Sequence, residues 1–361
     1  VDSLKIMTCG SVDDGKSTLL GRLIYETDNL LVDQSEYLSK LNQRYSKKNI
    51  DIDYSLLLDG LIDEREQGIT IDIAFKYFKI EENDAMFIDS PGHIEFTRNM
   101  ANAATFANIA LLMIDVKNGL TSQTEKHLEI VHSFNNIKKI IVCINKIDAI
   151  NYKHEKIESV IKDLNNLCKE KKYKIDQIIP ISGLKGDNIF SISDNYSEYK
   201  GSSLYSILKS YTQVSESLPL LDSTFLPVYF STKRQSDSRY FATKTINGNL
   251  NKQNVIKNIT TNEESKIKNI YHNFSKVDSV TVNQNVMIEL EREISVSKGD
   301  VFSTLEVEHT KLSNTINVEA IWINKNPFLN KRRYLFKFPS QKSYGFFSKT
   351  TESDIKINDF F

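Results

Sequence analysis

The segment Gly10–Ser17, which reads GSVDDGKS, constrains the fold more than any other part of the sequence. It matches the pattern G-x-x-x-x-G-K-[ST], and it lies between an apolar stretch, Leu4–Cys9, and a helix-like stretch, Ser17–Tyr25. In that setting glycine allows a backbone in which several N–H groups point at one anion, and the helix N-terminus adds partial positive charge. The sequence therefore predicts a phosphate-binding loop that joins the first strand of an α/β domain to its first helix.

Two carboxylates, Asp13 and Asp14, stand inside this loop, where an anion is expected to bind. Because backbone amides hold the phosphates, we expect both side chains to face outward. We expect Lys16 to reach the terminal phosphates and Ser17 to bind Mg²⁺. The residues expected around the phosphates are Gly10, Ser11, Val12, Asp13, Asp14, Gly15, Lys16, Ser17 and Thr18.

The first part of the chain alternates short apolar runs with helical patterns. The run 70–80 alternates apolar and polar residues, as an edge strand does, whereas the other runs are nearly continuously apolar, as in strands covered on both faces. This order predicts an α/β domain with a doubly wound, mostly parallel sheet. Strands are predicted at 4–9, 70–80, 85–89, 109–115, 139–145 and 177–182, and helices at 17–25, 93–105, 121–134, 157–171 and 203–211.

The pattern changes near residue 213 to short β-like runs with turn signals, among them the hairpin dipeptide Asn247-Gly248. The last stretch is basic, with nine Lys or Arg against four Asp or Glu from residue 311 onward. We therefore predict a nucleotide-binding domain over 1–213, a linker over 214–224, a small β-barrel domain over 225–310, and a partial second β-barrel over 311–361.

Three further signals follow predicted strands in chain order. The segment Asp89–Gly92, DSPG, fits D-x-x-G; we expect Asp89 to hold Mg²⁺ through water and the Gly92 amide to contact a third phosphate. Ser90 and Pro91 complete this part of the expected site. Because ligands of doubly wound sheets bind at the carboxyl ends of the strands, the signals are expected to converge on one crevice.

The other two signals concern the base. In Asn145–Asp148, NKID, we expect Asn145, Lys146 and Asp148 to bind the nucleotide, with Asp148 accepting hydrogen bonds from the N1–H and exocyclic amine of guanine. Adenine offers neither donor, so it would leave the carboxylate unpaired. The triplet Ser182, Gly183 and Leu184 is expected to support the guanine O6 through backbone N–H groups. The predicted ligands are GTP or GDP with Mg²⁺.

The segment Glu64–Asp72, EREQGITID, is a candidate switch. We expect Thr70 to bind Mg²⁺ and the third phosphate and to be released on hydrolysis. His93 directly follows the D-x-x-G signal, where it is expected to orient the attacking water, with a helix-capping or packing role as the alternative. The predicted catalytic residues are Lys16, Thr70 and His93.

The composition limits the partners and the compartment of the chain, although a local patch can still bind RNA. The formal net charge of −1 provides no global field for nucleic acid or anionic membranes, and no apolar run is long enough to cross a bilayer. The three cysteines are odd in number and lack CxxC spacing, so we expect reduced thiols and a cytoplasmic protein. The remaining histidines, which show no metal-ligand spacing and are expected to be structural or at the surface, are His127, His132, His154, His272 and His309.

The first 225 residues resemble the translation-factor class of P-loop GTPases, on the segments VDDGKSTL, EREQGITID and DSPGHIEFTRNM. Within that class they are most similar to the GTPase subunit of bacterial heterodimeric ATP sulfurylase, on GSVDDGKSTLLGRL, DYSLLLDGLIDEREQGITID, NIALLMIDVKNG and QTEKH. Elongation factors usually carry histidine where Ser11 and Asp14 stand.

The resemblance implies that the chain hydrolyses GTP to drive a partner, the catalytic ATP sulfurylase subunit, which makes adenosine 5′-phosphosulfate and pyrophosphate from ATP and sulfate. It implies a heterodimer or higher assembly, with no membrane and no expected nucleic-acid partner. Two alternatives stay open: an elongation-factor-like translational GTPase, and a non-catalytic GTP-binding interaction protein.

Overall fold

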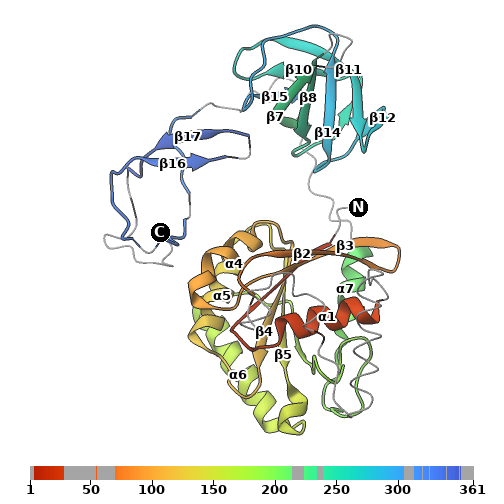
Figure 1. Cartoon of the computed structure of the whole chain (residues 1–361), viewed down its shortest axis with the longest axis vertical. Coiled ribbons are helices and arrows are strands. Elements are labelled where there is room, and N and C mark those ends of the chain that lie inside the picture. The colour runs from red at the N-terminus through yellow and green to blue at the C-terminus, as the bar shows by residue number, and fades with distance from the viewer. Residues whose placement is uncertain are drawn as a thin grey trace. The chain divides into compact units, whose positions relative to one another are not determined.

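The chain divides into two compact units, Val1–Ser215 and Glu216–Phe361 (Figure 1). A computed structural model describes residues 4–27, 54, 70–213, 223–233, 239–304, 313–318, 320–324, 326–338, 340–348 and 350. Outside these residues lie Glu64–Ile69 of the predicted switch, most of the predicted linker, and His309.

Unit 1 is built on a six-stranded sheet with the order β2-β3-β1-β4-β5-β6. All neighbours are parallel except β2, which pairs antiparallel with β3 at the edge. The predictions of a doubly wound sheet and of an alternating edge strand are therefore confirmed. The strands are β1 (Leu4–Gly10), β2 (Ala74–Ile80), β3 (Asn83–Asp89), β4 (Ile109–Asp115), β5 (Lys139–Asn145) and β6 (Gln177–Pro180).

Helices cover both faces of this sheet (Figure 1). On one face α1 and α7 pack over β1, β4 and β5, and on the other face α4 and α5 contact β1 or β4. The helices are α1 (Lys16–Glu26), α4 (Thr97–Ala104), α5 (Ser122–Ser133), α6 (His154–Lys171) and α7 (Leu204–Gln213), with 3-10 turns η2 (Ile94–Phe96) and η3 (Ile147–Ile150).

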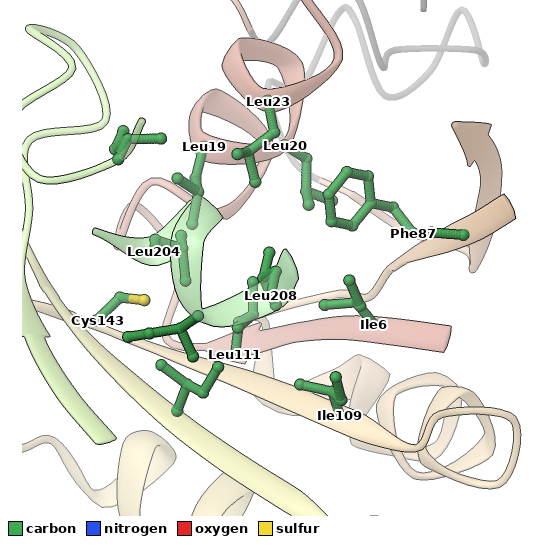
Figure 2. Close-up of a cluster of buried hydrophobic side chains, with 14 of the residues drawn as sticks. Ile6, Leu19, Leu20, Leu23, Phe87, Ile109, Leu111, Cys143, Leu204 and Leu208 are labelled. Carbon is green, nitrogen blue, oxygen red and sulfur yellow. The ribbon is translucent and has the colours of Figure 1, made fainter. Parts of the chain in front are cut away.

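The core on the α1 side is mostly aliphatic, includes the stacked rings of Phe78 and Phe87, and leaves almost no side chain accessible (Figure 2). Leu19 and Leu20 of α1 and Leu208 of α7 pack against Ile6 of β1 and Leu111 of β4. Burial of both faces explains why the central strands read as continuous apolar runs.

Two of the three cysteines, Cys9 and Cys143, are buried in this sheet, and all three are free thiols.

The strand order reverses beside β1, because β3 pairs with one of its edges and β4 with the other. A doubly wound sheet binds ligands at such a point, outside the carboxyl ends of the strands. The loop after β1, Gly10–Ser17, lies at this position and runs directly into α1. The fold thus brings the phosphate-binding motif to the one crevice that the topology provides.

Unit 2 begins with a β-barrel. Its strands follow the order β10-β15-β7-β8-β14-β11-β12, and an additional pairing of β10 with β11 closes the ring. The predicted barrel is confirmed, with Leu226, Phe241, Ile288 and Phe302 in its core. The strands are β7 (Phe225–Lys233), β8 (Arg239–Lys244), β10 (Val255–Asn258), β11 (Glu264–His272), β12 (Ser275–Val277), β14 (Asn285–Leu290) and β15 (Val301–Thr304), with a short pair β9 (Leu250–Asn251) and β13 (Ser279–Val280).

The described residues beyond 311 contain one antiparallel hairpin, β16 (Tyr334–Lys337) with β17 (Lys342–Gly345). Trp322 and Phe328 pack against one face of it in an aromatic cluster with Tyr334. One hairpin does not form a barrel, so the partial second barrel over 311–361 stays a prediction. Among the described helices, none is both long and apolar enough to span a bilayer.

Candidate nucleotide-binding site

The backbone of the loop Gly10–Ser17 needs glycine at both ends. Gly10 has a φ of 133° and Gly15 a φ of 89°. A Cβ at Gly10 would stand 2.5 Å from the carbonyl oxygen of Met113, and one at Gly15 would strike the side-chain amide of Asn145. Conformation and space therefore both exclude larger residues. Val12 and Thr18 are half-buried in and beside the loop.

Lys16 is buried, and its ammonium group stays within the loop. Its Nζ donates to the carbonyl oxygens of Gly10, at 3.2 Å, and Ser11, at 2.6 Å. Burial lowers the pKa of Lys16, and the carboxylates of Asp89 and Asp14 oppose that shift. Gly92 lies directly against the ammonium, where a Cβ would clash with it. The loop and the DSPG segment thus meet at Lys16.

The two carboxylates of the loop lie on opposite sides of it. Asp13 is exposed, as expected for an outward side chain. Its backbone has a φ of 65°. The expectation is wrong for Asp14, which is 2% exposed and accepts a hydrogen bond from the Ser11 N–H to Oδ2 at 2.6 Å. Burial raises the pKa of Asp14 to about 6, and Lys16 and the backbone amides of Ser11 and Asp115 oppose the rise. The carboxylate faces inward because it supplies an acceptor for an amide of the loop's first turn.

His127 of α5 supports the loop from beneath. It is fully buried, and its Nδ1 accepts a hydrogen bond from the Gly10 N–H at 2.9 Å. Burial, assisted by the charge of Lys16, lowers the pKa of His127 to about 3, so the ring is neutral and carries its proton on Nε2. That nitrogen lies 2.7 Å from Nε2 of Gln123, and because the ring donates from this nitrogen, we assign the Gln123 amide with its oxygen toward the ring. The stretch QTEKH puts both residues on one helix face, but nothing in the sequence links it to the loop.

Three oxygen-bearing side chains from three segments converge at the start of α1. The hydroxyl of Ser17 lies 3.5 Å from that of Thr70 and donates to Oδ2 of Asp89 at 3.3 Å. Thr8 donates to the other oxygen of Asp89 at 3.0 Å and fixes the carboxylate. Hydroxyl and carboxylate oxygens suit Mg²⁺, which completes its shell with phosphates and water. No group of three or more His, Cys, Asp or Glu in the described chain could hold a metal on its own.

The DSPG segment is anchored to β1. Ser90 donates its hydroxyl to the carbonyl of Thr8, and Pro91 is buried. His93 is half-buried and caps η2, where its Nδ1 accepts from the Glu95 N–H at 3.2 Å. The capping contact named as the alternative for His93 is therefore present. A neutral His93 ring that accepts a hydrogen bond at Nδ1 carries its proton on Nε2, and this N–H can donate to a water molecule.

Asn145 joins the phosphate half of the site to the base half. Its side-chain amide donates to the carbonyl of Asp14 at 2.7 Å and accepts from the Gly183 N–H at 2.9 Å. Ser182 donates its hydroxyl to Oδ1 of Asp148 at 2.6 Å, so NKID and SGL meet at that carboxylate. The structure thus brings together Gly10–Thr18, Thr70, Asp89–His93, Asn145, Lys146, Asp148 and Ser182–Leu184.

Lys146 and Leu184 lie at the rim of the half of the site that is expected to bind the base. Lys146 has a φ of 64°, and its ammonium pairs with Asp115, 2.8 Å away at the end of β4. Leu184 as a whole residue is 39% exposed. Besides His127 and Gln123, sequence reasoning missed Thr8 and Asp115, which hold site residues without belonging to any motif.

We predict that His127 makes the fold sensitive to acid. Its folded pKa of about 3 lies below its ordinary value of 6.5, so between these values the unfolded chain binds a proton that the folded chain does not, and stability falls as the pH falls. From pH 7.5 to 5.0 this residue should cost about 2 kcal/mol. Urea unfolding at both pH values should show a loss that is larger by that amount in the wild type than in His127→Gln. Equal losses would contradict a neutral buried His127.

Comparison with known proteins identifies the domain. Residues 2–218 match the elongation factor Tu GTP binding domain family. Among solved structures, the GTPase-like domain of Ski7 from S. cerevisiae, in complexes with GTP and with GDP and inorganic phosphate, superposes with a TM-score of 0.58 at 18% identity, over 99% of this chain and 88% of that one. At this identity the likeness concerns the fold alone.

Two curated relatives share more of the sequence. Sulfate adenylyltransferase subunit 1 of Shewanella woodyi is 34% identical over 347 residues, which cover 96% of this chain and 72% of that protein. The subunit 1 of Saccharophagus degradans is 34% identical over 95% of this chain and 72% of that protein. This chain is therefore a member of the sulfate adenylyltransferase subunit 1 family, and its first unit is a GTP-binding domain of the elongation factor Tu family.

Proposed function

We propose that this protein is the GTPase subunit of a sulfate adenylyltransferase. It binds GTP with Mg²⁺, hydrolyses it, and uses the released free energy to drive a partner subunit that makes adenosine 5′-phosphosulfate and pyrophosphate from ATP and sulfate. The observation that carries the proposal is the link through Asn145 between the phosphate loop and Gly183, next to the Ser182 hydroxyl that donates to Asp148, in a chain of this family.

The geometry around Asp148 supports guanine as the base. Ser182 fixes one carboxylate oxygen, and the other lone pairs can accept from the guanine N1–H and amine. Of the three neighbouring amides, that of Gly183 donates to Asn145 and that of Lys185 to Ser182. The amide of Leu184 has no acceptor within the described residues, so we assign it to the guanine O6.

The residues at the phosphate end suit phosphoryl transfer to water. Lys16 moves from the carbonyls of its own loop to the terminal phosphates, and Thr70 contributes its hydroxyl beside Ser17. His93, at the end of DSPG, donates from Nε2 to the attacking water and holds it in line. Ser17, Thr70 and, through water, Asp89 would hold Mg²⁺, which neutralises charge on the phosphates.

Coupling to the partner requires that the GTP and GDP forms bind different states of it. Thr70 is suited to change position between the GTP and GDP forms, because it reaches the Ser17 hydroxyl from another segment. The partner is the catalytic ATP sulfurylase subunit, in a heterodimer or a higher assembly. The three free thiols support a cytoplasmic location.

The proposed function predicts that GTP hydrolysis depends on the partner and its substrates. The measurement is phosphate release from GTP by the full chain alone, with the catalytic subunit, and with that subunit plus ATP and sulfate. The rate should rise at least tenfold in the complete mixture, and omission of sulfate should abolish most of the rise. A rate independent of the catalytic subunit would contradict the proposal, and stimulation by ribosomes would favour a translational GTPase instead.

Asp148→Asn should change the base preference. The amide can donate to the xanthine O2 but cannot accept both guanine donors, so affinity for GDP should fall at least 100-fold while affinity for xanthosine diphosphate rises. Competition against a fluorescent nucleotide measures both constants. Retained affinity for GDP would show that Asp148 does not read the base.

His93→Ala should spare GTP binding and lower the single-turnover rate of hydrolysis by about 10²-fold or more, because the water loses its orienting donor. The matched control is His93→Gln, which keeps a donor and should recover part of the rate. An unchanged rate in His93→Ala would leave capping of η2 as the role of this residue.

A further inference from the structure

Arg22 of α1 holds the loop that we assign to the guanine base. Its guanidinium donates from one nitrogen to the carbonyl oxygen of Leu184 at 2.6 Å and to that of Gly183 at 3.3 Å. Its Nε donates to Glu26, one turn further along the helix, at 2.6 Å. The side chain is only 13% exposed, so a charged group is kept in place by carbonyl and carboxylate acceptors.

The guanidinium lies in a closely fitted slot. On one side the Tyr54 ring centroid lies 4.9 Å from the guanidinium carbon. On another side is Gly186, with a φ of 91°, where a Cβ would stand 2.5 Å from the guanidinium. Gly21 lets Tyr54 approach, because a Cβ there would overlap the Tyr54 backbone. A planar group of fixed shape fits this space better than the flexible ammonium of lysine.

The two carbonyls that Arg22 holds belong to the peptide units that follow Gly183 and Leu184. In a trans peptide the C=O of one residue and the N–H of the next point in opposite directions. A Gly183 carbonyl that faces α1 therefore turns the Leu184 N–H away from α1. Arg22 thereby fixes the direction of the one neighbouring amide that we assign to the guanine O6.

The second peptide unit acts on Asp148 through two hydrogen bonds. With the Leu184 carbonyl on Arg22, the Lys185 N–H points the other way and donates to the Ser182 hydroxyl at 2.9 Å. That hydroxyl is thus left to donate to Oδ1 of Asp148 at 2.6 Å. One guanidinium therefore orients both groups that would read the base, the Leu184 amide at O6 and the Asp148 carboxylate at N1 and the exocyclic amine.

We propose that Arg22 is a positioning residue for base specificity, which sets the Leu184 amide for the guanine O6 and, through Lys185 and Ser182, the Asp148 carboxylate for N1 and the exocyclic amine. The inference rests on the proposed placement of guanine. It predicts that loss of Arg22 affects recognition of the base more than recognition of the phosphates.

The test compares GDP with 6-thioguanosine diphosphate, which keeps the donors for Asp148 but replaces O6 with sulfur, a weak acceptor. Both compete against a fluorescent GDP on the full chain. The wild type should prefer GDP about tenfold, as expected for one hydrogen bond to the Leu184 amide. In Arg22→Met the preference should fall to about twofold or less, with the larger loss in GDP affinity.

Two further variants keep the inference testable if Arg22→Met folds poorly. Arg22→Lys retains the positive charge but lacks the planar guanidinium, so it should also lose most of the preference for GDP. Tyr54→Leu, which loosens the slot, should lose part of it. Lys126→Met is the control, since it removes an ion pair with Glu129 on α5 and should keep the preference of the wild type.

The outcomes separate the inference from the proposal on which it rests. A wild type that discriminates, with Arg22 variants that keep the ratio or weaken both ligands equally, would overturn the role of Arg22 and leave the base assignment standing. A wild type that binds both ligands equally, or that does not bind GDP, would overturn the placement of guanine itself.

Discussion

The site depends on the two hydrogen bonds of the Asn145 side chain. This amide lies at the end of β5, is 2% exposed, and links the carbonyl of Asp14 in the phosphate loop to the Gly183 N–H in the base loop. The amide supplies a donor and an acceptor at once, whereas the ionised carboxylate of Asp, which has the same shape, could only accept. Because Asn145 is placed by a strand inside the sheet, it fixes the distance between the groups that we assign to the two ends of a nucleotide.

The phosphate loop is supported by side chains of three different kinds. A carboxylate, Asp14, accepts from the Ser11 N–H, and a neutral imidazole, His127, accepts from the Gly10 N–H. An ammonium, Lys16, donates to the carbonyls of the same two residues. Burial of these groups disfavours their charged forms, so each needs the partners it has. The hydrogen bonds of these three side chains hold the polar backbone of the loop in one conformation beside the apolar sheet.

The sequence was sufficient for the parts of the structure that periodicity and chain order determine. The continuous apolar runs of β4 and β5 predicted buried parallel strands, and the alternation of 70–80 predicted the edge strand β2. The motif residues converge because each follows a strand of one sheet. Asp14, His127 and Arg22 were not predictable in the same way. Their roles depend on the direction of a side chain within a loop, or on a partner distant in the sequence, as in the contact of His127 with Gly10.

We infer that one connected set of side chains reads both ends of a guanine nucleotide. A crystal structure of the full chain with Mg²⁺ and a non-hydrolysable GTP analogue tests it most directly. We expect the Asp148 carboxylate to accept from the guanine N1–H and amine, the Leu184 amide to donate to O6, the Asn145 bridge to stay intact, and the Lys16 ammonium to contact the phosphates. A base that lies away from Asp148, or an Asn145 side chain released from Asp14 and Gly183, would contradict it.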